Sequence, residues 1–154
     1  MLRILFYLSL AIFLATFSTA YSVPSSYGPY EGIVKRVVDG DTIKVDAFVA
    51  PGMIATFSVR VRGIDAPEVS RACEAERELG KQARDFVRNL YKPGDIVKLD
   101  DVGSDKYAGR VVANIYRKIP SGEFVKLSTE LLIAGLAVSY DGKSSHTKIW
   151  CPEN

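Results

Sequence analysis

A strict alternation of apolar and polar residues constrains the fold of this chain more than any other feature. Residues 56–64 read TFSVRVRGI, which places Val59 and Val61 on one face of an extended chain. Arg60 and Arg62 then fall on the opposite face. A period of two is typical of a β-strand with one buried face. Similar short strand-like runs are found at residues 32–38, 42–49, 95–99 and 110–118.

Two helices are expected, one after the third strand and one after the fifth. The longer one is indicated by apolar residues at helical spacing, namely Leu79, Ala83, Phe86, Val87 and Leu90. Pro93 and Gly94 should end it. Residues 128–136 predict a short helix with Ser128 as its N-cap and Gly135 as its stop. The order of three strands, a helix, two strands and a helix predicts a mainly β fold with helices (α+β), a five-stranded barrel of the OB type.

The first twenty residues differ from the rest of the 154-residue chain. Arg3 is their single charged residue, an apolar run follows it, and the small residues STA end at Ala20. This pattern is typical of a cleaved secretory signal peptide. An uncleaved membrane anchor is the alternative, but the apolar run is shorter than the ~20 residues that a bilayer span needs. We therefore expect a signal peptide at 1–20, a flexible leader at 21–31 and one domain at 32–154.

Charge and cysteine content narrow the functional classes. The net charge is only +2, so any attraction to nucleic acid must come from local placement of Lys and Arg. Cys73 and Cys151 are an even pair, which in an exported chain suggests a disulfide, with two free thiols as the alternative. The single histidine, His146, excludes zinc sites that need paired histidines. We expect a secreted or periplasmic monomer without stable membrane association after cleavage.

Acidic residues interrupt the strand pattern of VVDGDTIKV, residues 37–45. Asp and Gly are poor strand residues, so Asp39 and Gly40 predict a turn, and a plain hairpin turn is one explanation of the whole motif. Asp41 then begins the second strand, and Asp65 follows the third. Two carboxylates on adjacent strands, with a backbone carbonyl at the corner, suit a hard cation such as calcium or magnesium.

Three further residues suggest the kind of substrate on which such a cation would act. Glu68 follows Asp65 by three residues and is not needed as a ligand of the cation, so it can act as a base. Capping of the next helix is its alternative role. Arg60 and Arg110 can face the same site, whereas Arg62 is assigned to solvent and a surface ion pair is the alternative for Arg110. Arginines beside a cation and a carboxylate suit a phosphodiester, because attack builds negative charge on the phosphoryl oxygens.

Four motifs, in this order and spacing, resemble the staphylococcal nuclease (thermonuclease) family: DGDT at 39–42, RVRGIDAPE at 60–68, ELGKQARDF at 78–86 and DKYAGR at 105–110. The resemblance runs from about Gly32 to Leu136, and the signal peptide and cysteine pair resemble the family's exported bacterial branch. It implies an OB-barrel with helices and a calcium-dependent endonuclease that hydrolyses DNA and RNA, with magnesium as the other candidate ion.

The resemblance also implies roles by position. The implied metal ligands are Asp41, Asp65 and the main-chain oxygen of Ala66. The implied catalytic residues are the general base Glu68 and the phosphate-binding Arg60 and Arg110. The implied substrate-binding residues are Lys106, Tyr107 and, with a one-residue gap, Tyr140. Ala66 replaces a common Thr, which removes a hydroxyl but keeps the carbonyl, and Ala108 is inserted ahead of Gly109.

Two other classes of protein compete with a nuclease. An OB-fold module can bind single-stranded nucleic acid without cutting it, through aromatic platforms and a basic groove. A periplasmic structural protein is the third class. Neither needs three acidic and two arginine side chains to converge, so the sequence favours a nuclease.

Overall fold

The computed structural model describes residues 24, 26–70, 73–142 and 150–151. The expected signal peptide and His146 lie outside these residues. No helix in the described ranges combines the length and apolar character that a bilayer crossing requires.

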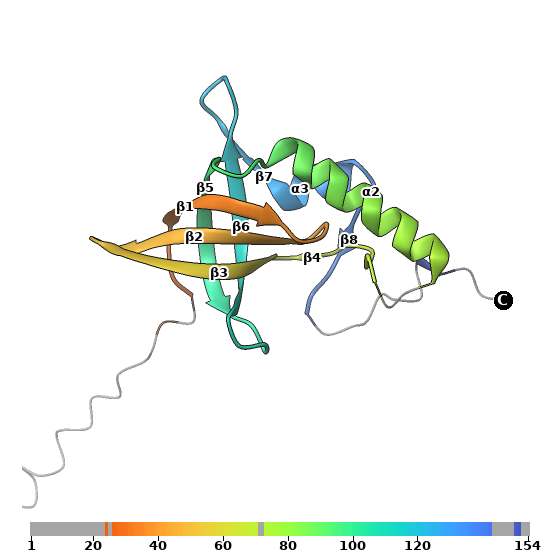
Figure 1. Cartoon of the computed structure of the whole chain (residues 1–154), viewed down its shortest axis with the longest axis horizontal. Coiled ribbons are helices and arrows are strands. Elements are labelled where there is room, and N and C mark those ends of the chain that lie inside the picture. The colour runs from red at the N-terminus through yellow and green to blue at the C-terminus, as the bar shows by residue number, and fades with distance from the viewer. Residues whose placement is uncertain (1–23, 25, 71–72, 143–149, 152–154) are drawn as a thin grey trace, which may run out of the picture.

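Five strands form a closed barrel, as the sequence predicted (Figure 1). They are β1 (Tyr30–Val37), β2 (Thr42–Ala50), β3 (Met53–Val61), β5 (Ile96–Ser104) and β6 (Arg110–Lys118). Their order is β3-β2-β1-β5-β6, and a parallel pairing of β3 with β6 closes the barrel. The other neighbouring pairs are antiparallel. The barrel is therefore a mixed one of the OB type.

Three short strands add to this barrel. β7 (Phe124–Lys126) pairs with the end of β6, while β4 (Ile64–Asp65) and β8 (Val138–Ser139) form a separate two-stranded sheet. β1 begins inside the range expected for the leader, and Tyr27 makes an isolated bridge to Val102. Ordered pairing therefore begins before residue 32.

The helix α2 (Glu74–Leu90) lies along one side of the barrel next to β4 and β8 (Figure 1). It begins five residues before the predicted apolar stripe, because Cys73 acts as the N-cap and its Sγ accepts from the backbone N–H of Glu76 at 3.4 Å. Ala83 and Val87, both in the predicted stripe, are fully buried.

The helix α3 (Leu127–Ile133) corrects one prediction and confirms another. Ser128 is a buried residue within the helix and not its N-cap, because β7 runs directly into α3 and Leu127 is already packed in the core. Gly135 does end the helix. Its φ is +68°, and the bonds from Gly135 N–H to Leu132 O and from Leu136 N–H to Leu131 O form a Schellman motif.

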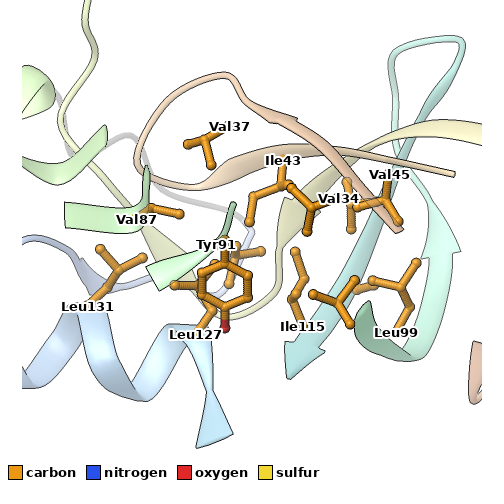
Figure 2. Packing of buried hydrophobic residues seen from close by; sticks show 14 of the residues in the cluster. Val34, Val37, Ile43, Val45, Val87, Tyr91, Leu99, Ile115, Leu127 and Leu131 are labelled. Atoms are coloured by element: carbon orange, nitrogen blue, oxygen red, sulfur yellow. The ribbon is translucent and has the colours of Figure 1, made fainter. Parts of the chain in front are cut away.

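The core joins the barrel interior to both helices (Figure 2). Inward side chains of the strands, such as Val45, Leu99 and Ile115, belong to the same buried cluster as Val87 of α2 and Leu131 of α3. Each fully buried aliphatic side chain of this size contributes about 1.5–3 kcal/mol. This packing fixes the position of α2 against the strands, and the candidate site depends on that position.

The predicted disulfide joins Cys73 and Cys151, with the two Cα atoms 6.0 Å apart. It links positions 78 residues apart in sequence, and closing a loop of that size is worth about 4 kcal/mol in the chain-entropy model. The carboxylate of Glu76 lies close to both sulfur atoms. These sulfurs are bonded to each other, so the group is not a metal site, which would need thiolates.

Candidate active site

A tight turn aims Asp41 into the protein. The backbone N–H of Asp41 donates to Asp39 Oδ1 at 3.2 Å, which is the turn role expected of Asp39. A Cβ at Gly40 would lie 2.7 Å from the Cβ of Ala83 and 3.0 Å from that of Ala66, so only glycine lets the turn approach α2 this closely. Asp41 is consequently only 4% exposed at the start of β2.

Asp41 and Asp65 converge on one guanidinium group. Arg60 Nη2 lies 3.0 Å from Asp41 Oδ2 and 2.6 Å from Asp65 Oδ1. Asp41 also accepts from the Ala66 backbone N–H at 3.3 Å and from the Thr42 hydroxyl at 3.0 Å. The structure therefore gathers two predicted metal ligands and one predicted phosphate-binding residue at a single point.

Burial changes the pKa values of the charged side chains in this cluster. It raises the pKa of Asp41 to about 7, against the lowering effect of the Arg60 charge. Burial alone would lower the pKa of Arg60, but the carboxylates of Asp41 and Asp65 raise it above its usual value. The pKa of Glu68 is also raised, first by partial burial and then by the negative charge of Asp39. The cluster thus favours additional positive charge.

Closure of the barrel brings the two predicted arginines together. In the parallel β3–β6 pairing, Ser58 is opposite Arg110 and Arg60 is opposite Val112. Alternate residues of a strand share a face, so Arg60 and Arg110 project from the same face of adjacent strands, two positions apart. The pairing joins strands that are far apart in the sequence, so the residues next to Arg60 or Arg110 do not indicate that the two lie close together.

A pocket of about 490 Å³ lies over this face. Six of the predicted site residues line it: Arg60, Glu68, Lys106, Tyr107, Arg110 and Tyr140. Tyr140 reaches it because β8 pairs with β4 and the Tyr140 N–H donates to Gly63 O at 3.0 Å. Asp41, Asp65 and Ala66 are not among the lining residues, and Arg60 connects the two acids to the pocket.

The other side of the pocket is a loop between β5 and β6. Arg110 Nε lies 2.9 Å from Asp105 Oδ2, and the guanidinium carbon is 4.5 Å from the centre of the Tyr107 ring. Lys106 Nζ is 5.2 Å from the same ring. Burial alone would raise the pKa of Asp105, but its hydrogen bond from Arg110 lowers it. Tyr107 thus contacts both cations of the loop.

Residues 58–149, more than half of the chain, match the family described as staphylococcal nuclease homologue. The chain belongs to this family. The matched range contains Arg60, Asp65, Glu68 and Arg110, whereas Asp41 precedes it. The family assignment made from four short motifs is therefore confirmed.

Two curated relatives are named as endonucleases. The chain is 38% identical over 124 residues to Endonuclease YhcR of Bacillus subtilis, which covers 76% of this chain and 9% of that protein. It is 33% identical over 99 residues to Probable endonuclease C19F8.04c of Schizosaccharomyces pombe, which covers 63% of this chain and 41% of that protein. The chain thus spans less than half the length of either relative.

Several lining residues of this nuclease-family pocket were not predicted as part of the site, and two of them, Arg62 and Asp105, form ion pairs. Arg62 had been assigned to solvent, but it lines the pocket and pairs through Nε with Asp101 Oδ2 at 2.9 Å. Its Nη2 also donates to the main-chain oxygens of Asp101 at 2.7 Å and Val112 at 3.2 Å. Its place on the same strand face as Arg60 was the available signal. Asp105, at the start of the DKYAGR motif, is the second.

Proposed function

We propose that the protein is a metal-dependent nuclease that hydrolyses phosphodiester bonds within DNA, RNA or both, by attack of an activated water. The observation that carries this proposal is the pocket itself. Two arginines, Arg60 and Arg110, line it together with the acidic residue Glu68. Asp41 and Asp65 lie directly behind Arg60. The printed names of the two endonuclease relatives support the same activity.

The donor atoms around Asp41 fit a hard divalent cation. Two carboxylates already approach one positive group, and the raised pKa of Asp41 reflects negative charge that burial leaves poorly compensated. Asp41, Asp65 and the Ala66 carbonyl oxygen would hold the ion, calcium being our first choice and magnesium the second. When bound, the ion would neutralise charge that develops on the phosphoryl oxygens.

The remaining residues divide the chemistry between them. Glu68 takes a proton from the attacking water, and its raised pKa brings it closer to the neutral range in which a general base works best. Arg60 and Arg110 donate hydrogen bonds to the non-bridging oxygens, where negative charge builds. Lys106, Tyr107 and Tyr140 hold the flanking substrate. Two arginines suit phosphate because each presents a fork of N–H donors.

The proposal places the enzyme outside the cytoplasm as a monomer without stable membrane association. The disulfide between Cys73 and Cys151 supports the location outside the cytoplasm, because such bonds persist in oxidising compartments. Protein purified from the periplasm or medium should begin at Tyr21, as measured by mass spectrometry, if cleavage follows Ala20. An intact Met1 terminus in the membrane fraction would contradict it.

The decisive experiment is a cleavage assay on the purified protein with its disulfide intact. Circular single-stranded DNA and a linear RNA of similar length are incubated with calcium, with magnesium or with chelator. We expect cutting with a divalent cation and none with chelator, and a cut circle identifies internal cleavage. Glu123→Gln is the control variant and should cut like the parent, since Glu123 is an exposed glutamate that does not line the pocket. Tight binding without cutting under every condition would favour the binding module.

A further inference from the structure

The first turn of α2 carries a buried glutamate that reaches toward the candidate active site. Glu76 is only 1% exposed. Its Oε1 accepts a hydrogen bond from the backbone N–H of Glu68 at 3.2 Å, and its Oε2 lies 3.4 Å from Cys151 Sγ. A carboxylate is rarely buried so completely unless a specific contact requires it.

Capping of the helix does not account for this contact. Glu76 is the third residue of α2 after its N-cap, Cys73. A glutamate at this position commonly turns back to the backbone N–H of the N-cap residue. Here its Oε1 accepts instead from Glu68, eight residues earlier in the chain. The carboxylate therefore joins the helix to the segment that carries the proposed base.

Gly80 makes a second contact to the same segment, one turn further along α2. A Cβ at this position would lie 2.6 Å from Glu68 O and 2.8 Å from Pro67 O. Glycine inside a helix is unfavourable, so its presence is explained by this close approach of two backbones. Glu76 thus accepts a hydrogen bond from the N–H of Glu68, and the missing side chain of Gly80 lets the Glu68 carbonyl lie against the helix.

We propose that Glu76 is a positioning residue for Glu68, which fixes the backbone of the proposed general base against α2. The inference rests on the proposed function, in which Glu68 activates water. The Glu68 side chain is exposed to the pocket, so its location depends on where its backbone is held. A base acts only within hydrogen-bond reach of its proton, and a displacement of about 1 Å can cost 10²-fold in rate.

Two substitutions at position 76 separate positioning from stability. Glu76→Gln keeps an oxygen that can accept from Glu68, and kcat should remain within about threefold of the parent. Glu76→Leu has similar size but no acceptor, and kcat should fall by about 10- to 100-fold with little change in KM. Glu76→Leu should still fold, as circular dichroism can check, because leucine fills a similar volume and loss of the hydrogen bond from the Glu68 N–H should remove only a small part of the stability. Glu78→Leu, at an exposed position of the same helix, is the control and should match the parent.

Gly80→Ala tests the same contact from its other side. Alanine favours the helix, so the variant should fold, but its Cβ must push Glu68 away from α2. We expect a lower kcat here as well. Amide hydrogen exchange of Glu68 gives a readout that does not depend on activity. It should become at least about tenfold faster in Glu76→Leu and stay at the parent rate in Glu76→Gln.

A double variant distinguishes this inference from the proposed function. If Glu76 acts through Glu68, then Glu76→Leu should cause no further loss of kcat in a Glu68→Gln background. Additive losses would overturn the inference, as would parent kcat and unchanged Glu68 exchange in Glu76→Leu. A Glu68→Gln variant that cuts as fast as the parent would instead overturn the proposed base, and with it the catalytic role of Glu76. Glu68 exchange would then report only on the hydrogen bond.

Discussion

The pocket has two sides that are held in different ways. One side, the corner, is defined as Asp41, Arg60, Asp65 and Glu68: Arg60 and Glu68 line the pocket, and Asp41 and Asp65 pair with Arg60 outside its lining. These residues come from the turn before β2, from β3, from β4 and from the segment that contacts α2. The other side, called the β5–β6 loop, spans residues 104–110 and includes the last residue of β5 and the first residue of β6. Arg110 in this loop contacts Asp105 and Tyr107, both of which belong to the loop itself.

This difference in support should decide what a substitution on each side affects. A group that stabilises a transition state must be fixed before the reaction, which is easiest on rigid elements supported by others. The corner meets this condition because several elements contact it. In the loop, by contrast, the side chains of Asp105, Tyr107 and Arg110 contact one another, and the main chain of Gly109 and Arg110 adjoins Ser58 of β3. Substitutions at the corner should therefore affect both turnover and stability, and substitutions in the loop turnover or affinity alone.

The largest effect is expected from Glu68→Gln. Glutamine keeps the shape of the side chain but cannot take a proton from water, and loss of a general base costs about 10²–10⁴-fold in rate. Calcium affinity, measured by titration calorimetry, should stay close to that of the parent because Glu68 is not assigned as a ligand. Cleavage of one oligonucleotide under single-turnover conditions gives the rate. Unchanged cleavage would remove Glu68 from the mechanism.

A matched pair of arginine variants tests the comparison directly. Arg60→Lys and Arg110→Lys both keep the charge but lose the fork that fits a phosphate, so each should lower turnover by about 10²-fold. Only Arg60→Lys should also lower the free energy of unfolding, by about 1–3 kcal/mol, because Arg60 bridges Asp41 and Asp65. Chemical denaturation measures this difference. Equal losses of stability in the two variants would contradict the division into corner and loop.

The third prediction concerns the stability of the corner against pH. Burial raises the pKa of Asp41 from 3.8 to about 7, so the folded protein binds this proton more tightly than the unfolded chain. Without a divalent cation, this contribution to stability is present at low pH. It should be lost as pH rises from about 4 to 7, at about 1 kcal/mol per pH unit.

Asp41→Asn isolates that contribution because asparagine does not ionise. In chelator, the parent should lose unfolding free energy relative to Asp41→Asn as the pH rises from about 4 to 7. Saturating calcium should remove the trend, since a bound cation favours the charged carboxylate, and it should bind the variant more weakly. Urea unfolding across this pH range provides the measurement. A difference that does not vary with pH in chelator would show that Asp41 is not the titrating group.

The sequence predicted the corner better than its surroundings, for a physical reason. DGDT and RVRGIDAPE are short motifs whose roles depend on local turns and on two adjacent antiparallel strands. Period-two alternation likewise predicted the strands that form the barrel. These signals are local, so a single sequence contains them.

The features that were missed depend on contacts between distant parts of the chain. The sequence predicted that Arg60 and Arg110 face the same site, but not the parallel β3–β6 pairing that brings their strands together, which exists only once the barrel closes. Tyr91 is fully buried just after the end of α2 and continues the four-residue spacing of Ala83 and Val87, although the predicted stripe ended at Leu90 (Figure 2). Ser128 resembled an N-cap, but the packing of Leu127 extended α3 past it.

The smallest effect is expected in the loop, from Tyr107→Leu. Tyr107 is 56% exposed, and the centre of its ring lies 4.5 Å from the guanidinium carbon of Arg110. Exposed cation–π contacts are worth about 0.5–1 kcal/mol, so kcat/KM should fall by about two- to fivefold. Tyr107→Phe keeps the ring and should retain most of the activity unless the hydroxyl binds the substrate's phosphate. The melting temperature should not change in either variant, because the ring packs on the loop and not on the core. A clear loss of stability in Tyr107→Leu would mean that the loop supports the barrel, and the contrast with the corner would fail.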